Sequence, residues 1–183
     1  MNDRSIQLVR ASVKGDRASY DALVRDYTGF VYTMAFRMTG DHHLAEDLCQ
    51  EIFIKAWMSL GKLKKHEAFP GWLATLGRRI CLNAIKKRNR KKEVAEDEAE
   101  PAKVNPVMPS SFNAARVILE ETVSRLSLQD RQLITLSYFE ELSSAEVAGI
   151  MDLEPGTVRV YLMRAREKLR ELLKGREHEL FER

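Results

Sequence analysis

Apolar residues recur every three or four positions along most of this 183-residue chain, which is the period of an amphipathic α-helix. In the first half of the chain this period predicts four helices, over residues 6–14, 20–40, 42–60 and 70–90. Gly15 and Gly40 stand where the first two helices should end, and Asp16 and Asp41 stand where the next two should be capped. The short segment 61–69 is predicted to be a basic loop.

The helical period stops at residue 91 and resumes at residue 112. The intervening segment contains three prolines and a run of acids, a composition that favours an extended linker. Beyond it the period predicts helices over 112–125 and from Ser127 to about residue 138. The sequence therefore predicts an all-α fold of two small helical domains, 1–90 and 112–183, joined by a flexible acidic linker over 91–111.

A helix-turn-helix is predicted near the end of the chain. Ser143 and Glu146 have the spacing of a capping box at the start of a short helix. Pro155 suits the first position of a second helix, because the N–H that proline lacks would have no partner there. Val158 and Ala165 belong to an apolar stripe on that second helix, and its other face is basic. These features are what reading a DNA major groove requires.

Composition excludes several classes of protein. No apolar run reaches the roughly 18 residues of a membrane span, and the first residues lack the apolar core of a signal peptide, so we expect a cytoplasmic protein that does not insert into a membrane. Cys49 and Cys81 sit among apolar helical positions, and we expect two small buried side chains. Metal-ligand spacings, nucleophile–base pairs and phosphate-binding glycine loops are absent, so we expect no metal, no cofactor and no enzymatic activity.

The net charge of +3 conceals a strong asymmetry. Between residues 62 and 92 there are eleven basic residues and one acid, Glu67, and five acids follow between 93 and 100. The basic block coincides with a helix that has a clear apolar stripe, which favours a nucleic-acid-binding surface over a solvated helix face. The helix over 42–60 instead gathers acidic and amide side chains on its outer face, which suits either a soluble surface or a basic protein partner.

Three stretches of the sequence together resemble one family. AEDLCQEIFIKAW, FPGWLATLGRRICLNAIKKRNR and EPGTVRVYLMRAREKL are similar, in this order, to segments of the sigma-70 family of bacterial RNA polymerase subunits, and in particular to its extracytoplasmic-function (ECF) members. The resemblance covers both predicted domains. It implies an alternative sigma factor that binds core RNA polymerase, reads the promoter −35 element as duplex and the −10 element as melted strand, and is controlled by an anti-sigma factor that is often membrane-anchored.

The resemblance assigns the acidic face and the linker to the polymerase, and it implies contacts with both the β′ and β subunits. Asp47, Gln50 and Glu51 would contact the β′ clamp helices, while Phe53 would pack inside the domain. The acidic run from residue 93 to 100 would occupy the path through which RNA leaves the polymerase; a simple solvated linker is the alternative.

The basic block and the second helix of the helix-turn-helix are assigned to promoter DNA. The −10 element would be bound by Lys62, Lys64, Lys65, His66, Arg78, Arg79, Asn83, Lys86, Lys87 and Arg90. Asn83 is the best equipped of these to read a base edge. Trp57 and Trp72 could act as stacking platforms for bases, but both lie on apolar stripes, which favours a place in the core. The −35 element would be bound by Gly156, Thr157, Arg159, Val160, Arg164 and Arg166.

The chain departs from its relatives at one of these positions. Many relatives carry a Ser-Arg pair after the first arginine of this helix, whereas Val160 and Tyr161 stand there in this chain, so Val160 is expected to contact a thymine methyl group. A second hypothesis is a stand-alone regulator that dimerises through its N-terminal helices. Such a regulator would bind a palindromic duplex tightly by itself, whereas a sigma factor would need core polymerase.

Overall fold

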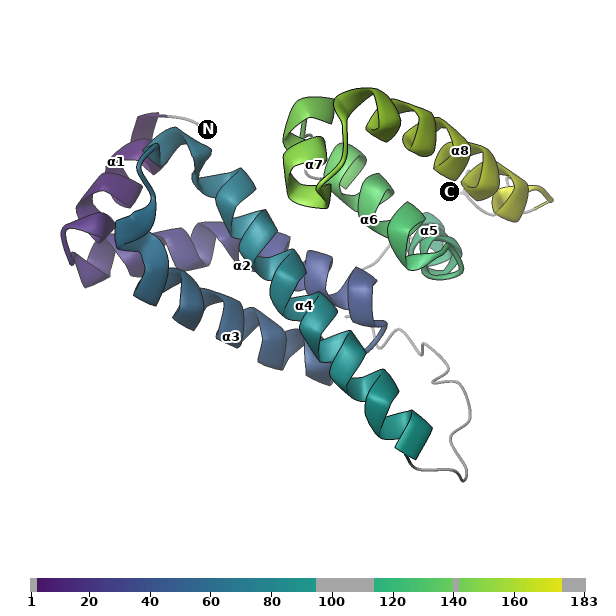
Figure 1. Ribbon diagram of the computed structural model, residues 1–183, viewed down its shortest axis with the longest axis horizontal. Helices are drawn as coiled ribbons and strands as arrows, with labels where there is room; N and C mark the ends of the chain where they lie inside the picture. Colours follow the sequence, from purple (N-terminus) through teal and green to yellow (C-terminus); the bar gives the residue numbers. More distant parts are fainter. Residues whose placement is uncertain (1–2, 95–113, 140–141, 176–183) are drawn as a thin grey trace.

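The computed structural model describes residues 3–94, 114–139 and 142–175, which form helices and no strands (Figure 1). The N-terminal domain contains four helices: α1 (Asp3–Val13), α2 (Arg17–Thr39), α3 (His42–Ser59) and α4 (Phe69–Val94). Two single 3₁₀ turns, η1 (Leu60–Lys62) and η2 (His66–Ala68), join α3 to α4. The expected all-α fold is confirmed.

The capping side chains lie where the sequence predicted them. The Asp16 carboxylate accepts a hydrogen bond from the backbone N–H of Ala18 (3.2 Å), and Asp41 accepts one from the backbone N–H of Leu44 (3.1 Å). Gly40 ends α2 in the left-handed conformation, with φ of 67°. The predicted helices were therefore correct in number and position in this domain.

Three helix boundaries differ from the prediction by three or four residues, and one of them is the start of α2, at Arg17 and not at residue 20. Helix α1 begins at Asp3 and not at residue 6, and α4 continues to Val94, four residues past its expected end. Lysine and glutamate propagate a helix well, and the first proline of the segment comes only at residue 101, so nothing in the sequence stops α4 at residue 90. The rest of the expected linker, 95–111, lies outside the described residues.

The N-terminal core lies between the four helices. Leu23, Ile52, Phe69 and Leu73 are fully buried there, and Phe53 is also buried, as expected. Both tryptophans pack against this core, which confirms the prediction that they are structural. The core is tight where α4 crosses α2 and α3, since a Cβ added at Gly77 would overlap the methyl group of Met34. The glycine therefore allows α4 to approach the other two helices closely.

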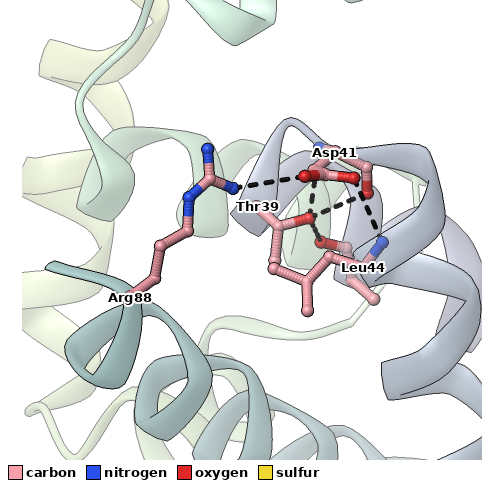
Figure 2. Close-up of polar contacts among 5 residues, drawn as sticks. Thr39, Asp41, Leu44 and Arg88 are labelled. Carbon is pink, nitrogen blue, oxygen red and sulfur yellow. Dashed lines mark hydrogen bonds and ion pairs between the residues drawn. The ribbon is translucent and has the colours of Figure 1, made fainter. Parts of the chain in front are cut away.

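A polar cluster fastens the start of α3 to the second half of α4 (Figure 2). Arg88 of α4 donates a hydrogen bond to the Asp41 carboxylate at 3.4 Å, and the Thr39 hydroxyl bonds to backbone groups at the end of α2. The Asp41 carboxylate thus caps α3 and holds α4. One cation of the basic block, Arg88, is in this way engaged inside the domain.

The two cysteines are buried free thiols. Burial raises the pKa of the Cys81 thiol to about 12 and also raises the pKa of Cys49 above its usual range. Because the thiolate is the reactive form, we expect neither thiol to be alkylated at about pH 8 in the native protein. Mass spectrometry should find no adduct in native buffer and two in denaturant. Rapid labelling of the native protein would contradict the burial of both side chains.

The C-terminal domain contains α5 (Ala114–Ser124), α6 (Leu128–Ile134), a π-helical turn η3 (Thr135–Phe139), α7 (Ser144–Met151) and α8 (Pro155–Leu173). The Ser143–Glu146 capping box forms in full, and Pro155 is the first residue of α8, so the predicted helix-turn-helix is confirmed. The helix expected to run from Ser127 to residue 138 instead widens into η3 after Ile134.

The helix-turn-helix turn depends on one residue with positive φ. Asp152 ends α7 in the left-handed conformation, with φ of 57°, and its backbone N–H bonds to the carbonyl of Ala148. This geometry lets α8 begin almost at once and cross α7. Val158 and Ala165 of α8 are then fully buried in the domain, as the apolar stripe predicted.

Candidate functional site

The outer face of α3 is acidic and exposed. Asp47 lies one turn before the adjacent residues Gln50 and Glu51 on α3, and all three side chains face solvent. Glu51 forms an exposed ion pair with Lys55, at 3.1 Å within the same helix. An exposed pair of this kind contributes little to stability and is easily exchanged for another partner, so the carboxylate stays available.

Two exposed apolar side chains, which sequence reasoning missed, extend this face. Ile54 is 61% exposed and Met58 is 77% exposed. Together with Asp47 and Glu51 they follow the i, i+4, i+7 and i+11 spacing of one helix stripe. The signal was present in the sequence, because both residues fall outside the apolar stripe of α3. Acids at one end and apolar side chains at the other form a surface of about three turns.

The basic segment between α3 and α4 is more ordered than the predicted loop. Leu63 and Phe69 are buried and anchor the 3₁₀ turns η1 and η2 to the N-terminal core. This anchoring leaves Lys62, Lys64 and Lys65 exposed, while His66 is half-buried. The segment therefore presents three ammonium groups from a short, fixed piece of backbone.

Most of the predicted −10 residues on α4 share one face. The residues Arg79, Asn83, Lys86, Lys87 and Arg90 follow at i, i+4, i+7, i+8 and i+11, and all are exposed. This arrangement places one amide group among four cations. Such a stripe can bind successive phosphates of a strand and offer the amide to a base.

Arg78 is not brought together with that stripe. It lies one position before Arg79 and therefore turns toward the C-terminal domain, where its Nε donates a hydrogen bond to Oε1 of Gln132 at 3.2 Å. Burial lowers the pKa of this guanidinium group. The sequence could not reveal this contact, since the two residues are 54 positions apart.

The exposed face of α8 carries the predicted −35 residues in an ordered pattern. Gly156 and Val160 lie along the middle of the face, with Arg159 and Arg166 on one side and Thr157 and Arg164 on the other. The side chains of Arg159, Val160, Arg164 and Arg166 are exposed, and that of Thr157 is half-buried. Two rows of cations and polar groups thus flank a central stripe.

Met163 belongs to that central stripe and was missed by the sequence analysis. It is 48% exposed, and Val160, one turn before it, is 44% exposed. The large exposed apolar side chains of the described residues are these two, the α3 pair and Tyr138. Isolated exposed apolar residues are common, but pairs on a helix face favour a binding surface.

The N-terminus of α8 is open to a ligand. Glu154 precedes Pro155 as the N-cap residue, and its side chain makes no capping hydrogen bond. The first backbone N–H groups of α8 therefore lack the side-chain acceptor that α7 has in Ser143. A helix start of this kind attracts a phosphate.

Other kinds of site are not seen in the described parts of the chain. No group of three or more His, Cys, Asp or Glu side chains there is placed to hold a metal ion. None of the helices in the same ranges is long and apolar enough to cross a membrane.

Comparison with known families matches both domains. Residues 23–91 match sigma-70 region 2, and residues 116–169 match sigma-70 region 4. The chain is 31% identical over 175 residues to the ECF RNA polymerase sigma-E factor of Escherichia coli (strain K12), covering 88% of this chain and 90% of that protein. It is 29% identical over 174 residues to the ECF sigma factor SigW of Bacillus subtilis (strain 168), covering 88% and 92%.

Solved structures share the fold. The sigma factor RpoE of Bartonella quintana, crystallised with the anti-sigma factor NepR, is similar with a TM-score of 0.74 and 24% identity, covering 85% of this chain and 97% of that chain. CnrH, solved in complex with the cytosolic domain of CnrY, is similar with a TM-score of 0.68 and 23% identity, covering 94% and 98%.

Proposed function

This chain belongs to the extracytoplasmic-function group of the sigma-70 family, and from that membership we propose that it binds core RNA polymerase and directs it to a set of promoters. Proteins of this family give initiation its specificity and are not enzymes, so this chain is not an enzyme. The observation that carries the proposal is the division of charge among three exposed helix faces: α3 is acidic, while α4 and α8 are basic.

The acidic face of α3 would bind the β′ clamp helices of core polymerase, with the β subunit as a further contact. Asp47 and Glu51 supply charge for the encounter, and Gln50 between them adds an amide that fixes register. Ile54 and Met58 give the same face an apolar end whose burial would add affinity. A surface with both properties suits a protein partner better than solvent alone.

The basic face of α4 and the three lysines before it would bind the −10 element as a single strand. Phosphate neutralisation by Lys86, Lys87 and Arg90 accounts for affinity, and Asn83 is the side chain best placed to read a base. His66, half-buried at the start of η2, stands at the junction between the lysines and α4. It would lie at the edge of the bound strand.

The exposed face of α8 would enter the major groove of the −35 element. Arg159 and Arg164 flank the groove-facing stripe and are the leading contacts to base edges or phosphates. The open N-terminus of α8 at Gly156 and Thr157 would bind a backbone phosphate and set the depth of the helix. Val160 and Met163 between the arginines would meet thymine methyl groups.

An anti-sigma factor is the proposed regulator. The two similar structures of RpoE and CnrH are complexes, with the anti-sigma factor NepR and with the cytosolic domain of CnrY. A protein that covers the exposed faces of α3 and α4 would block polymerase and promoter together. In this role the chain would act in the cytoplasm. A membrane-anchored anti-sigma factor would hold it at the inner face of the membrane until it is released.

Run-off transcription tests the proposed function. Purified chain added to core polymerase should give transcripts that start at discrete sites on genomic fragments, and the upstream sequences of those sites should share two spaced elements. Core polymerase alone is the control. Tight binding of the free chain to a palindromic duplex, with no new transcripts from the reconstituted polymerase, would favour the stand-alone regulator and contradict the proposal.

A further inference from the structure

Three buried hydrogen-bond donors belong to side chains around one small cavity. Among the residues that the structure describes, no hydrogen-bond partner is found for Arg131 Nε, Gln132 Nε2 or Thr135 Oγ1, although each of these atoms is buried. All three side chains line a cavity of about 10 Å³ between α2, α4, α6 and η3. Folded proteins rarely leave a buried donor unsatisfied, because it has lost its hydrogen bonds to water. Three such donors around one space indicate a ligand that accepts hydrogen bonds.

Neighbouring contacts fix the orientation of two of these donors. Arg78 donates from Nε to Gln132 Oε1 at 3.2 Å, and a guanidinium group can only donate. The Gln132 amide therefore keeps its oxygen on Arg78, which leaves its NH₂ group as the free donor. Arg131 donates from Nη1 to the backbone carbonyl of Arg37 at 2.9 Å and from Nη2 to that of Leu126 at 3.1 Å. These two bonds hold the guanidinium group in place and leave its Nε–H for a ligand.

The cavity carries an unbalanced positive charge. Its lining in the described ranges contains three arginines and no acid. Arg37 forms a forked ion pair with Glu120, with N–O distances of 3.1 and 2.6 Å, and the charge of Asp152 acts on Arg78. Burial lowers the pKa of the Arg131 guanidinium group, whose hydrogen bonds go to backbone carbonyls. A buried cation without a carboxylate calls for one negative charge.

The size of the cavity restricts the ligand to a single atom. A space of about 10 Å³ holds roughly one particle the size of a water molecule, so phosphate, sulfate and carboxylate ions are too large. Met34 and Met38 supply part of the wall, and flexible methionine side chains can adjust to a slightly larger particle. A water molecule needs acceptors for its own two hydrogens, whereas the polar groups here are mainly donors. A halide ion needs only donors.

We propose that this cavity is a binding site for chloride, held by the Arg131 Nε–H, the Gln132 amide and the Thr135 hydroxyl group. The ion balances the charge of Arg131 and satisfies all three donors together. Because the site exists only in the folded chain, chloride stabilises the protein by mass action. The site is independent of the proposed function, since none of its lining residues lies on α3 or α8.

Two substitutions alter the site by different routes. Gln132→Glu replaces the amide donor by a carboxylate of the same size, which supplies the missing negative charge and repels an anion. Thr135→Val removes the hydroxyl donor and keeps the shape of the side chain. The matched control is Thr122→Val, which removes a buried hydroxyl group of α5 that already donates to the Ile118 carbonyl at 2.7 Å and does not line the cavity.

Thermal unfolding at constant ionic strength tests chloride binding in solution, with sodium chloride replacing sodium glutamate stepwise. At chloride concentrations about tenfold above the dissociation constant, the unfolding midpoint of wild type and of Thr122→Val should rise by about 3–6 °C along a saturation curve. Thr135→Val should need at least about tenfold more chloride for the same rise, because it lacks one hydrogen bond to a charged group. Gln132→Glu should show no rise. The same chloride response in Thr135→Val as in Thr122→Val would overturn the proposal, whether or not Gln132→Glu folds.

Crystals of the full chain grown in sodium bromide test the position of the ion. Bromide occupies chloride sites and scatters X-rays anomalously, so an anomalous peak should lie in contact with Gln132 Nε2 and Thr135 Oγ1. Density without an anomalous signal would be a water molecule and would overturn the proposal. A bromide peak in a protein whose unfolding midpoint does not respond to chloride would be an adventitious ion only, and it would overturn the proposal as well.

Discussion

Replacing Asp47 and Glu51 together by lysine is expected to lower affinity for core RNA polymerase by at least about a hundredfold. Breaking one desolvated charge pair at an interface costs about 2–5 kcal/mol, and a tenfold loss corresponds to about 1.4 kcal/mol. Reversal also sets like charges against a basic partner. Both side chains are exposed on α3, so the domain should fold normally. Fluorescence anisotropy of labelled protein with core polymerase measures the change.

The control for this experiment is Glu171→Lys, which reverses an exposed acid on α8, in the other domain. It should leave core affinity within about twofold, because a single exposed charge outside the α3 face contributes little to binding there. Binding of the double variant to a −35 duplex should also be unchanged. Normal core affinity in the double variant would remove α3 as the polymerase-binding face.

Arg159→Ala is expected to weaken binding to the −35 duplex by about 1–3 kcal/mol, the usual value of one good arginine contact to a base edge. The holoenzyme should lose transcription in proportion, and preference at one base pair should relax. Competition gel shifts with single-base variants of the −35 element measure both effects.

Arg170→Ala provides the matched comparison, since it removes the same charge from an exposed position in the last turn of α8. If an arginine contacts only a phosphate, its loss should weaken binding to all duplex sequences evenly and reduce the dependence of affinity on salt. It should not change which bases are preferred. Equal behaviour of the two variants on cognate and altered duplexes would take Arg159 out of the base-reading set.

Local features of the fold were predictable because their causes are local. Asp16, Asp41 and Ser143 cap helices through backbone N–H groups two or three residues ahead, so a short window of sequence contains both partners. The helix-turn-helix was predictable for the same reason. The end of α4 was misplaced because the helical period stops at residue 91, although the charged residues that follow are good helix formers.

Contacts between distant residues were not predictable. Arg37 and Glu120 are separated by 83 positions, and neither residue stands in a motif. Arg78 illustrates the consequence. Its charge and position group it with the DNA-facing cations of α4, whereas in the structure it bonds to Gln132 of the C-terminal domain. A helical wheel gives the direction of a side chain but not what a second domain places there.

The apolar members of the binding faces were hidden for a different reason. Ile54, Met58 and Met163 are apolar residues in helices, so a pattern search counts them toward a core. Their exposure can be inferred from sequence only by comparing each with the apolar stripe of its own helix, and Ile54 and Met58 fall outside the stripe of α3. The acidic and basic residues of the same faces were predictable, because charged side chains are expected on the protein surface.

The most direct test of the central claim is co-migration with core polymerase. The pure chain, mixed with sigma-free core enzyme and no inhibitor, should elute with it as a one-to-one complex in size-exclusion chromatography, and the complex should retain a promoter fragment that neither component retains alone. Elution of the chain as a separate peak at micromolar concentrations of both would contradict the account.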